Sequence, residues 1–392
     1  MKRFDMIIQG GGLVGLTAVN VLASKGFSVA LIERQKPTLE WDKSRFDFRC
    51  SAISRGSERL FQSVNLWKKM VDDRVSPYQR MRVWDALGYG EIMFDAAEVA
   101  EPDLGHIIEN HVMLKALWQA AEENSNITLY VNSPPIAVET RDENILLILE
   151  NNTVIQGNLL IGADGGHSWL RESLKIETHR RDYQQAALVA TVTTELPHAA
   201  TAYQRFLPEG PLAFLPLAKP NTSSIVWTTT PEKAQILLAL EDAAFCKTLT
   251  QHFDAQLGSV LTVMDRKSFK LEGLQAKRTI DDRVVLIGDA AHVIHPLAGQ
   301  GVNLGLWDVK KLTEILEEAR DKQIDIGHPL ILRKYERATK GHVTMMKLAM
   351  EFFNILFKTD STAAIGARSM GLNFMNNAKF LKKRIILEAM GI

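Results

Sequence analysis

The sequence lacks several features that would assign it to a familiar class of protein. Only two of its 392 residues are cysteines, Cys50 and Cys246, which are too few for a disulfide framework and show no metal-ligand spacing. We therefore expect no metal site and a reducing compartment, which is typical of the cytoplasm. The 46 basic residues are balanced by 46 acidic ones, so the overall charge gives no reason to expect a nucleic-acid partner.

Long apolar runs are also missing. No stretch reaches the ~18 apolar residues that a membrane-spanning helix needs. Lys2 and Arg3 precede an apolar segment, but this segment is short and runs directly into glycines, which is typical of a first β-strand and not of a signal peptide. With 46% hydrophobic residues, the sequence predicts a globular protein, soluble or peripheral to a membrane, with length for two domains.

The glycine-rich segment near the N-terminus has the context of a dinucleotide site. A strand at Phe4–Gln9 is followed by GGGLVG, then by a helix and a second strand that ends at Glu33. In this arrangement Gly10 makes the tight turn, Gly12 lets a pyrophosphate approach the backbone and Gly15 lets the helix pack on the strand. Glu33 would accept a hydrogen bond from a ribose hydroxyl. The alternative is a glycine turn with a structural role only.

Two further strand ends carry an aspartate beside a glycine. Leu159–Ala163 predicts a buried strand followed by DGGHSWLR, which begins at Asp164. Val284–Ile287 predicts another strand, followed by GDAAHVIHPLAGQGVNLG, in which Asp289 precedes a glycine-rich helix start. Because open α/β sheets bind ligands at the carboxyl ends of their strands, both carboxylates are candidate binding groups. For DGGHSWLR alone, a loop with a helix-capping serine is an open alternative.

The remaining regions have different patterns. Between residues 181 and 277, strand-like runs broken by proline-rich turns predict an antiparallel sheet, with one helix around Glu232–Phe253. From Arg333 onward the sequence predicts helices and contains eleven Arg and Lys but only four Asp and Glu, with a nearly continuous apolar run at Met345–Phe357. Basic and apolar helices are typical of contact with a membrane surface. The alternative is a packed terminal helix with a solvated basic face.

Together, the three motifs resemble those of the FAD-dependent single-component aromatic hydroxylases. More closely, the chain is similar over nearly its whole length to the flavin hydroxylases of ubiquinone biosynthesis (the UbiH/UbiF/UbiI, or VisC, family), including its C-terminal KYERATKG and LEAMGI. Within this family, the segments DLGHIIEN, ALVATVTTELPH, GPLAFLPL and SIVW are most similar to the subgroup that hydroxylates a 2-polyprenylphenol (2-octaprenylphenol) at ring carbon 5.

The resemblance implies an α/β fold of the para-hydroxybenzoate hydroxylase type. It has a Rossmann-like FAD-binding domain, an inserted antiparallel β-sheet substrate domain and a C-terminal helical segment. The expected boundaries are 1–75, 100–180 and 277–332 for the discontinuous FAD-binding domain, 76–99 and 181–276 for the substrate domain, and 333–392 for the helical region.

The resemblance also implies which residues contact FAD. Arg49 would lie near the flavin and the pyrophosphate, and the backbone at Val131 would meet the adenine. Asp164 would serve both FAD and the nicotinamide donor, Asp289 would bind the ribityl chain, and Pro296 would line the flavin near its reacting edge. The complete set of expected cofactor-binding residues is Gly10, Gly12, Gly15, Glu33, Arg34, Arg49, Val131, Asp164, Asp289, Pro296, Gly299, Gln300, Gly301, Val302 and Asn303.

The helix start at 299–303 would run under the isoalloxazine, where the helix dipole favours the negative charge of the reduced ring. His111 occupies a position at which many flavin hydroxylases have an arginine, which puts a flavin contact there in doubt. We interpret His292 and His295 as structural, because the family's chemistry resides mainly in the flavin. No residue is assigned as a catalytic base.

The implied chemistry is that of a monooxygenase. NADPH or NADH would reduce FAD as a transient donor, O2 would add to give a C4a-hydroperoxyflavin, and the oxygen would pass to the ring of a polyprenylated phenol. The protein would hold the ring close and exclude water. The absence of a second GxGxxG and of a redox CxxC argues against the flavoprotein disulfide reductases.

Several alternatives stay open at this point. The hydroxylated position could be carbon 6 or carbon 1 of the same pathway, or the substrate could be a soluble aromatic compound. A non-enzymatic alternative is an FAD-stabilised scaffold in a biosynthetic complex. The resemblance is compatible with a cytoplasmic protein that contacts the inner face of the membrane and other ubiquinone-biosynthesis proteins.

Overall fold

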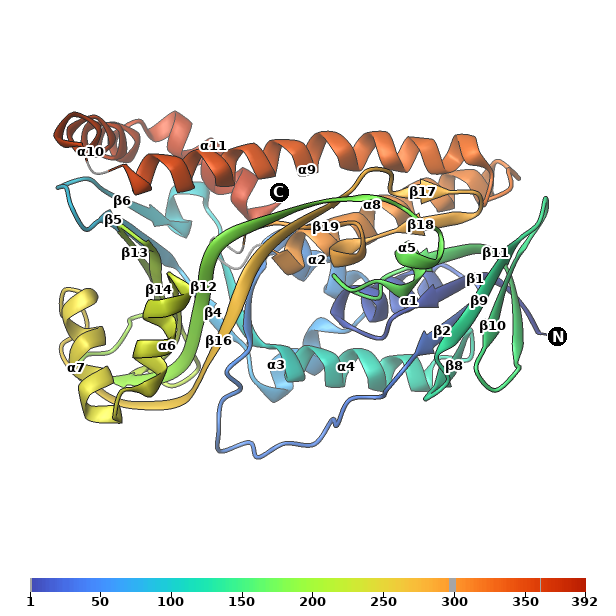
Figure 1. Ribbon diagram of the computed structural model, residues 1–392, viewed down its shortest axis with the longest axis horizontal. Helices are drawn as coiled ribbons and strands as arrows, with labels where there is room; N and C mark the ends of the chain where they lie inside the picture. Colours follow the sequence, from blue (N-terminus) through green and yellow to red (C-terminus); the bar gives the residue numbers. More distant parts are fainter. Residues whose placement is uncertain (1, 296–300, 360) are drawn as a thin grey trace.

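The structure is a computed structural model that describes residues 2–295, 301–359 and 361–392. Its strands form two sheets of eight strands and a small sheet of three. A long C-terminal helix runs along the top of the molecule in Figure 1 and contacts elements of both large sheets. The arrangement is the expected combination of an α/β layer, a second sheet and a C-terminal helical segment.

The first large sheet is built mainly from parallel strands in the order β17-β18-β11-β1-β2-β8, with β10 and β9 attached through β11. Its central strands are short apolar runs, buried on both faces as expected for parallel strands. The segment expected as a strand at Leu159–Ala163 is the second half of the longer strand β11, which pairs with β10 through its first half and ends one residue earlier, at Gly162. The strands are β1 (Lys2–Gln9), β2 (Val29–Glu33), β8 (Ile127–Val131), β9 (Pro135–Thr140), β10 (Ile145–Leu149), β11 (Val154–Gly162), β17 (Ile280–Asp281) and β18 (Val284–Leu286).

Three helices cover one face of this sheet. They are α1 (Leu13–Ser24), α4 (Asn110–Glu123) and α8 (Gly301–Asp321). Met6 and Ile8 of β1 face these helices within the largest hydrophobic cluster, whereas Ile7 belongs to the cluster on the opposite face. This alternation follows the two-residue period of a strand and explains why the apolar run of β1 is continuous.

The second large sheet has the order β19-β16-β12-β15-β14-β13-β5-β6. Its neighbouring strands are antiparallel, as predicted, except that β13 and β5 are parallel. The two 17-residue strands β12 and β16 belong to the second sheet and curve back toward the first, as the long ribbons in Figure 1 show. The strands are β5 (Arg80–Asp85), β6 (Glu91–Asp95), β12 (Thr178–Thr194), β13 (Thr201–Leu207), β14 (Gly210–Pro216), β15 (Thr222–Thr229), β16 (Val260–Ala276) and β19 (His292–Val293).

Two local features of this region differ from the prediction. The segment expected as one helix forms α6 (Pro231–Ala239) and α7 (Asp242–His252), because Leu240 and Glu241 have extended ψ angles of 144° and 149°. Strand β16 was not predicted, since charged and exposed residues interrupt the alternation along it. It forms because it pairs with β12 along almost its full length.

A small sheet connects the two large ones. It consists of β3 (Cys50–Ser54), β7 (Gly105–Glu109) and β4 (Ser76–Tyr78). Strand β3 leads directly into α2 (Arg55–Ser63), and α3 (Trp67–Asp73) follows. Because α2 and β3 both contact α8, this sheet joins the helix layer to the second large sheet.

The C-terminal region forms three helices, α9 (Pro329–Lys358), α10 (Thr362–Asn377) and α11 (Lys379–Met390). Helix α9 begins beside α8 and reaches the second sheet, where the ring of Phe357 stacks on Phe206 of β13 with centroids 3.7 Å apart. Within the described part of the chain, no helix combines the length and apolarity needed to cross a bilayer. The residue boundaries given above for the domains stay a prediction.

Candidate functional site

The strand ends that carry the three motifs lie side by side in the first sheet. Gln9, the last residue of β1, pairs with Gly162 of β11 and with Ile32 of β2. Gly162 in turn pairs with Leu286 of β18. Because all four strands are parallel, the segments that follow them leave the sheet at one edge. Motifs separated by more than 250 residues therefore meet there.

The three glycines of GGGLVG meet three different steric demands. Gly10 has φ +108°, and a Cβ there would lie 2.3 Å from the carbonyl oxygen of Ala163. A Cβ on Gly15 would lie 1.9 Å from the Gly10 oxygen, so this position allows α1 to pack against the turn. A Cβ on Gly12 would meet nothing within 4 Å, so its backbone faces open space. Gly12 is also the N-cap of α1, whose first turn contains no acidic residue that would compete with a phosphate.

Glu33 and Val131 end neighbouring parallel strands and pair with each other in register. The Glu33 carboxylate accepts hydrogen bonds from the backbone N–H groups of Gly11 and Gln35, the latter at 2.9 Å. Glu33 thus lies directly beside the glycine turn. Arg34 follows it on the exposed surface.

Asp164 follows β11 and is held in place by its neighbours. Its Oδ2 accepts hydrogen bonds from Gln9 Nε2 at 3.0 Å and from the Leu170 backbone N–H at 3.1 Å. Its Oδ1 is buried and has no hydrogen-bond partner among the residues that the structure describes. Burial raises the pKa of Asp164 above its ordinary value. Gln9 was not among the predicted site residues, although a glutamine at the end of an apolar strand is a detectable signal.

Arg171 joins the second motif to the third. Ser168 caps the short helix α5 (Trp169–Ser173) by accepting from the Arg171 N–H at 3.0 Å, so the capping interpretation of this serine is correct. The Arg171 side chain is only 1% exposed and donates to the carbonyl oxygens of Gly166 at 2.8 Å and Ala290 at 2.9 Å. It therefore fixes the loop after β11 against the turn after β18.

Asp289 lies in the 3-10 turn that follows β18, between Gly288 and Ala290. Its side chain is accessible to solvent, but the surrounding protein displaces enough water to raise the pKa of its carboxyl group. Gly288 has φ +57° and packs against Val14 of α1. The turn thus presents an accessible carboxylate close to the start of α1.

The His292 side chain supports this turn from inside the protein. Its Nε2 lies 2.7 Å from Oδ2 of Asp308 on α8, and both side chains are buried. The same oxygen accepts from the Gly288 N–H at 2.9 Å. Burial by itself would lower the pKa of His292, but the charge and hydrogen bond of Asp308 raise it above its ordinary value. His295 lies 3.1 Å from the Gln185 side-chain oxygen. These contacts support a structural role for both histidines.

The side chain of Asn303 is fully engaged by protein groups. Its Oδ1 accepts from the Ser54 N–H at 2.9 Å and from Ser57 Oγ at 2.8 Å, and its Nδ2 donates to the Ala52 carbonyl at 2.7 Å. A flavin contact at this position would therefore involve the backbone. Gly301 begins α8, and a Cβ there would meet nothing within 4 Å.

Other expected residues are placed less directly. Val302 packs against the core beside α1. Arg49 precedes β3, and its guanidinium lies 5.0 Å from the ring centroid of Phe269 on β16, so its flavin contact stays a prediction. His111 contacts Asp47 at 3.1 Å and packs on Trp41, which occupies it with protein partners. The expected residues Pro296, Gly299 and Gln300 lie outside the described residues.

One group of side chains has the geometry of a metal site. The ligand atoms of Glu58, Asp103 and His106 lie within 4.8 Å of one another. The guanidinium of Arg55 pairs with Glu58 and with Glu101, and lies 3.5 Å from Asp103. Because this guanidinium already supplies the positive charge, we assign no metal there.

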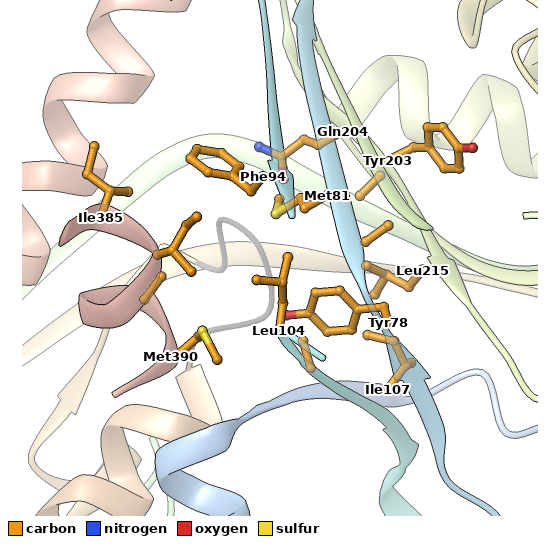
Figure 2. A pocket seen from close by; sticks show the side chains of 15 residues that line it. Tyr78, Met81, Phe94, Leu104, Ile107, Tyr203, Gln204, Leu215, Ile385 and Met390 are labelled. Carbon is orange, nitrogen blue, oxygen red and sulfur yellow. The ribbon is translucent and has the colours of Figure 1, made fainter. Parts of the chain in front are cut away.

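An apolar cavity of about 110 Å³ lies beside β3, on the side of the strand opposite the start of α8 (Figure 2). The Ala52 side chain lines it, whereas the Ala52 carbonyl is bound by Asn303. The other walls come from β4, β5, β6, β7, β13, β14 and α11. The cavity is therefore separated from the beginning of α8 by one strand.

The nucleotide-facing residues fit FAD in three respects. Gly12 leaves space for a pyrophosphate at an uncapped helix start, Glu33 and Val131 flank that turn, and the buried oxygen of Asp164 lacks a partner among the described residues. Asp289 adds an accessible carboxylate at the same edge of the sheet.

Comparisons with known proteins agree with this geometry. The FAD binding domain family matches residues 3–345. The 3-demethoxyubiquinol 3-hydroxylase of Escherichia coli K12 is 34% identical over 388 residues, which cover 99% of this chain and 98% of that protein. The ubiquinone hydroxylase UbiL of Rhodospirillum rubrum is 34% identical over 390 residues, which cover 100% of this chain and 90% of that protein.

Among solved structures, p-nitrophenol 4-monooxygenase PnpA of Pseudomonas putida has the same fold. Its TM-score is 0.80 at 15% identity, with 100% of this chain and 99% of that chain covered. The fold of the para-hydroxybenzoate hydroxylase type is thus confirmed, as are the family assignment and the expectation of an FAD enzyme. The chain belongs to the FAD-dependent aromatic-ring monooxygenases, within the family that contains the hydroxylases of ubiquinone biosynthesis.

Proposed function

We propose that this monooxygenase hydroxylates the aromatic ring of a polyprenylphenol intermediate in ubiquinone biosynthesis, using NAD(P)H and O2. The observation that carries the proposal is the apolar cavity beside β3, whose volume of about 110 Å³ is of the same order as the ~150 Å³ cavity that holds benzene in an engineered protein. One wall is the C-terminal helix α11, which also presents apolar side chains to the surface.

The protein's own residues would bind the cofactor and keep water away from the reacting ring. The glycine turn and the start of α1 would hold the FAD pyrophosphate, Glu33 the adenosine ribose, and Asp289 the ribityl side. Bound FAD, reduced by NAD(P)H, supplies the oxygen-activating chemistry. The apolar walls would exclude water from the transfer. Asn303 would hold β3, and with it one cavity wall, at a constant distance from the start of α8.

Exposed apolar side chains support a contact with the membrane surface, where a polyprenyl tail resides. They gather on α10, α11 and the second half of α9, and the adjacent basic residues Lys379, Lys383 and Arg384 are exposed. An apolar surface with neighbouring positive charge suits an anionic bilayer. Within these three helices, the apolar residues with the largest exposed fractions are Leu348, Phe352, Ile355, Met370, Phe374 and Phe380.

We propose carbon 5 as the hydroxylated ring position, because the segments DLGHIIEN, ALVATVTTELPH, GPLAFLPL and SIVW are most similar to the subgroup that acts there. The E. coli relative is named for hydroxylation of 3-demethoxyubiquinol, so carbon 6 and carbon 1 are the alternatives within the pathway. Mass spectrometry of quinone lipids from cells lacking this protein separates them. Build-up of a polyprenylphenol, or of derivatives not hydroxylated at carbon 5, is the expected result. Demethoxyubiquinone would move the step to carbon 6, and a species unhydroxylated at carbon 1 would move it there.

A soluble aromatic compound is the second candidate substrate, since the cavity by itself accommodates one ring. An unchanged ubiquinone pool, in cells with no redundant enzyme, would favour this candidate. Full turnover on a phenol without a tail, together with no lipid association, would do the same. Bound flavin without substrate-stimulated oxidation of NAD(P)H would instead indicate a scaffold subunit.

A further inference from the structure

The cavity beside β3 is almost entirely apolar, and one buried polar side chain in its wall stands out. Gln204 of β13 is only 5% exposed. Figure 2 shows its amide beside Phe94, on the cavity side of the strand. Among the residues that the structure describes, this amide makes no hydrogen bond to another protein group. The amide is not sealed inside the protein, so its donor and its acceptor are both open to a ligand in the cavity.

The neighbours of Gln204 leave space in front of its amide. In the sheet, Gln204 pairs with Ala213 of β14 and lies two residues after Ala202, and both alanines line the cavity. Tyr203 lies between Ala202 and Gln204 in β13, and its ring points to the opposite face of the sheet, where it packs against Trp84 and Phe253. The alternation of β13 thus presents a single amide among small apolar side chains.

The cavity also reaches the protein surface. Ile385 of α11 lines it and is nevertheless 42% exposed, whereas its neighbour Ile386 is buried. Leu381, one turn earlier on α11, is 44% exposed. An apolar substituent on a ring in the cavity therefore has an apolar exit past Ile385.

We propose that the amide of Gln204 binds the hydroxyl group of the substrate's aromatic ring and selects phenols over rings without that hydroxyl. This assignment rests on the proposed function, because it places the substrate ring in this cavity. A phenol both donates and accepts one hydrogen bond, so its O–H can donate to Gln204 Oε1 or its oxygen can accept from Nε2. Gln204 is then a specificity-determining residue that touches the substrate.

The experiment compares two probes that differ only in the hydroxyl group, 2-prenylphenol and prenylbenzene. Their affinities for the oxidised FAD-loaded enzyme are measured from the change in flavin absorbance, without NAD(P)H, so that no turnover occurs. For the wild type we expect the phenol to bind about 3- to 10-fold more tightly, the amount that one hydrogen bond contributes. In Gln204→Leu this preference is expected to disappear, while prenylbenzene binds at least as well as to the wild type.

Two controls make the result specific. Tyr78→Phe removes a hydroxyl from the cavity wall and should keep the preference for phenol, while the ring of Tyr203, the other tyrosine of the lining, points away from the cavity in Figure 2. Gln251→Leu changes an exposed glutamine on α7 and should behave as the wild type. Without ligand, Gln204→Leu should melt at a temperature no lower than the wild type, since the amide makes no hydrogen bond to the protein that the substitution could break.

Several outcomes would overturn the assignment. A Gln204→Leu enzyme that still prefers the phenol, a preference lost in Tyr78→Phe instead, or a wild type indifferent to the hydroxyl would each do so. Failure of the proposed function is a separate result: the wild type would bind the phenol with the expected preference but, supplied with NAD(P)H and O2, would form no hydroxylated product.

Discussion

The C-terminal helices are attached to the second sheet by a buried ion pair, and its removal has a predictable effect. Arg368 of α10 and Asp85 of β5 have side-chain exposures of 0% and 1%. Nε of Arg368 donates to Asp85 Oδ2 at 2.7 Å and Nη2 donates to Oδ1 at 3.1 Å. The third nitrogen, Nη1, donates to the carbonyl oxygens of Leu356 and Thr359 at the end of α9. One guanidinium therefore holds α9, α10 and β5 together.

Arg368→Ala should destabilise this contact strongly. The substitution removes both charge-assisted hydrogen bonds and leaves the Asp85 carboxylate buried, with the Leu87 N–H at 3.2 Å as its one remaining hydrogen-bond donor among the described residues. Breaking a buried ion pair in this way costs about 3–5 kcal/mol. The FAD-binding strands are not part of the contact, so the loss should be local to α10 and α11. The double variant Asp85→Leu with Arg368→Met should lose less, because it leaves no unpaired buried charge.

Hydrogen exchange measured by mass spectrometry tests this prediction. Peptides from α10 and α11 should exchange faster by about two to four orders of magnitude in Arg368→Ala, while α1 keeps its protection. Arg141→Ala is the matched control, since Arg141 pairs with Glu139 at the surface and both side chains are more than half exposed. Its effect should stay below about 1 kcal/mol. Unchanged exchange in α10, or an equal loss in α1, would refute the reasoning.

Three further predictions concern the cofactor site, its support and the membrane surface. Gly12→Ala should leave the melting temperature of the FAD-free protein unchanged but reduce the flavin content of the purified enzyme, because the added methyl meets no protein atom. Gly15→Ala should lower both quantities, because its methyl would collide with the Gly10 carbonyl. Flavin absorbance and thermal denaturation measure the two effects. The pKa of His292 is raised in the folded protein, so its pairing with Asp308 stabilises the fold fully below pH ~6.5, and this contribution is lost as the pH rises through the folded-state pKa. His292→Asn should therefore lower the melting temperature more at pH 6 than at pH 9. Phe380→Asp should weaken sedimentation with anionic phosphatidylglycerol vesicles about tenfold, and an unchanged bound fraction would count against α11 as the contact.

Much of the site follows from patterns that are local in the sequence. Gly10, Gly12 and Gly15 were assigned separate roles because strand, turn and helix follow one another within a few residues, and the steric environment of each glycine matches its role. Asp164 and Asp289 were found in the same way, as carboxylates at strand ends. Such signals can be read from the sequence because each depends on backbone conformation over a short segment.

Other parts depended on the three-dimensional arrangement. Strand β16 forms through its pairing with β12, although its own residues show no clear alternation. The engagement of the Asn303 side chain by Ser54 and Ala52 joins residues about 250 positions apart. Arg368 and Asp85 are 283 positions apart. No local propensity encodes such contacts, because they form only when the sheets and helices have packed.

By itself, the sequence determined the family, the α/β class and the positions of the glycine and aspartate turns to which we assign nucleotide binding. The tertiary structure decided which residues have protein partners and which are left to bind a ligand. Gln204 illustrates the difference: in the sequence it is one polar residue in an alternating strand, and only the packing of α11 over β13 and β14 encloses its amide in an apolar cavity. The physical reason is that burial and hydrogen-bond satisfaction are properties of surfaces brought together by folding.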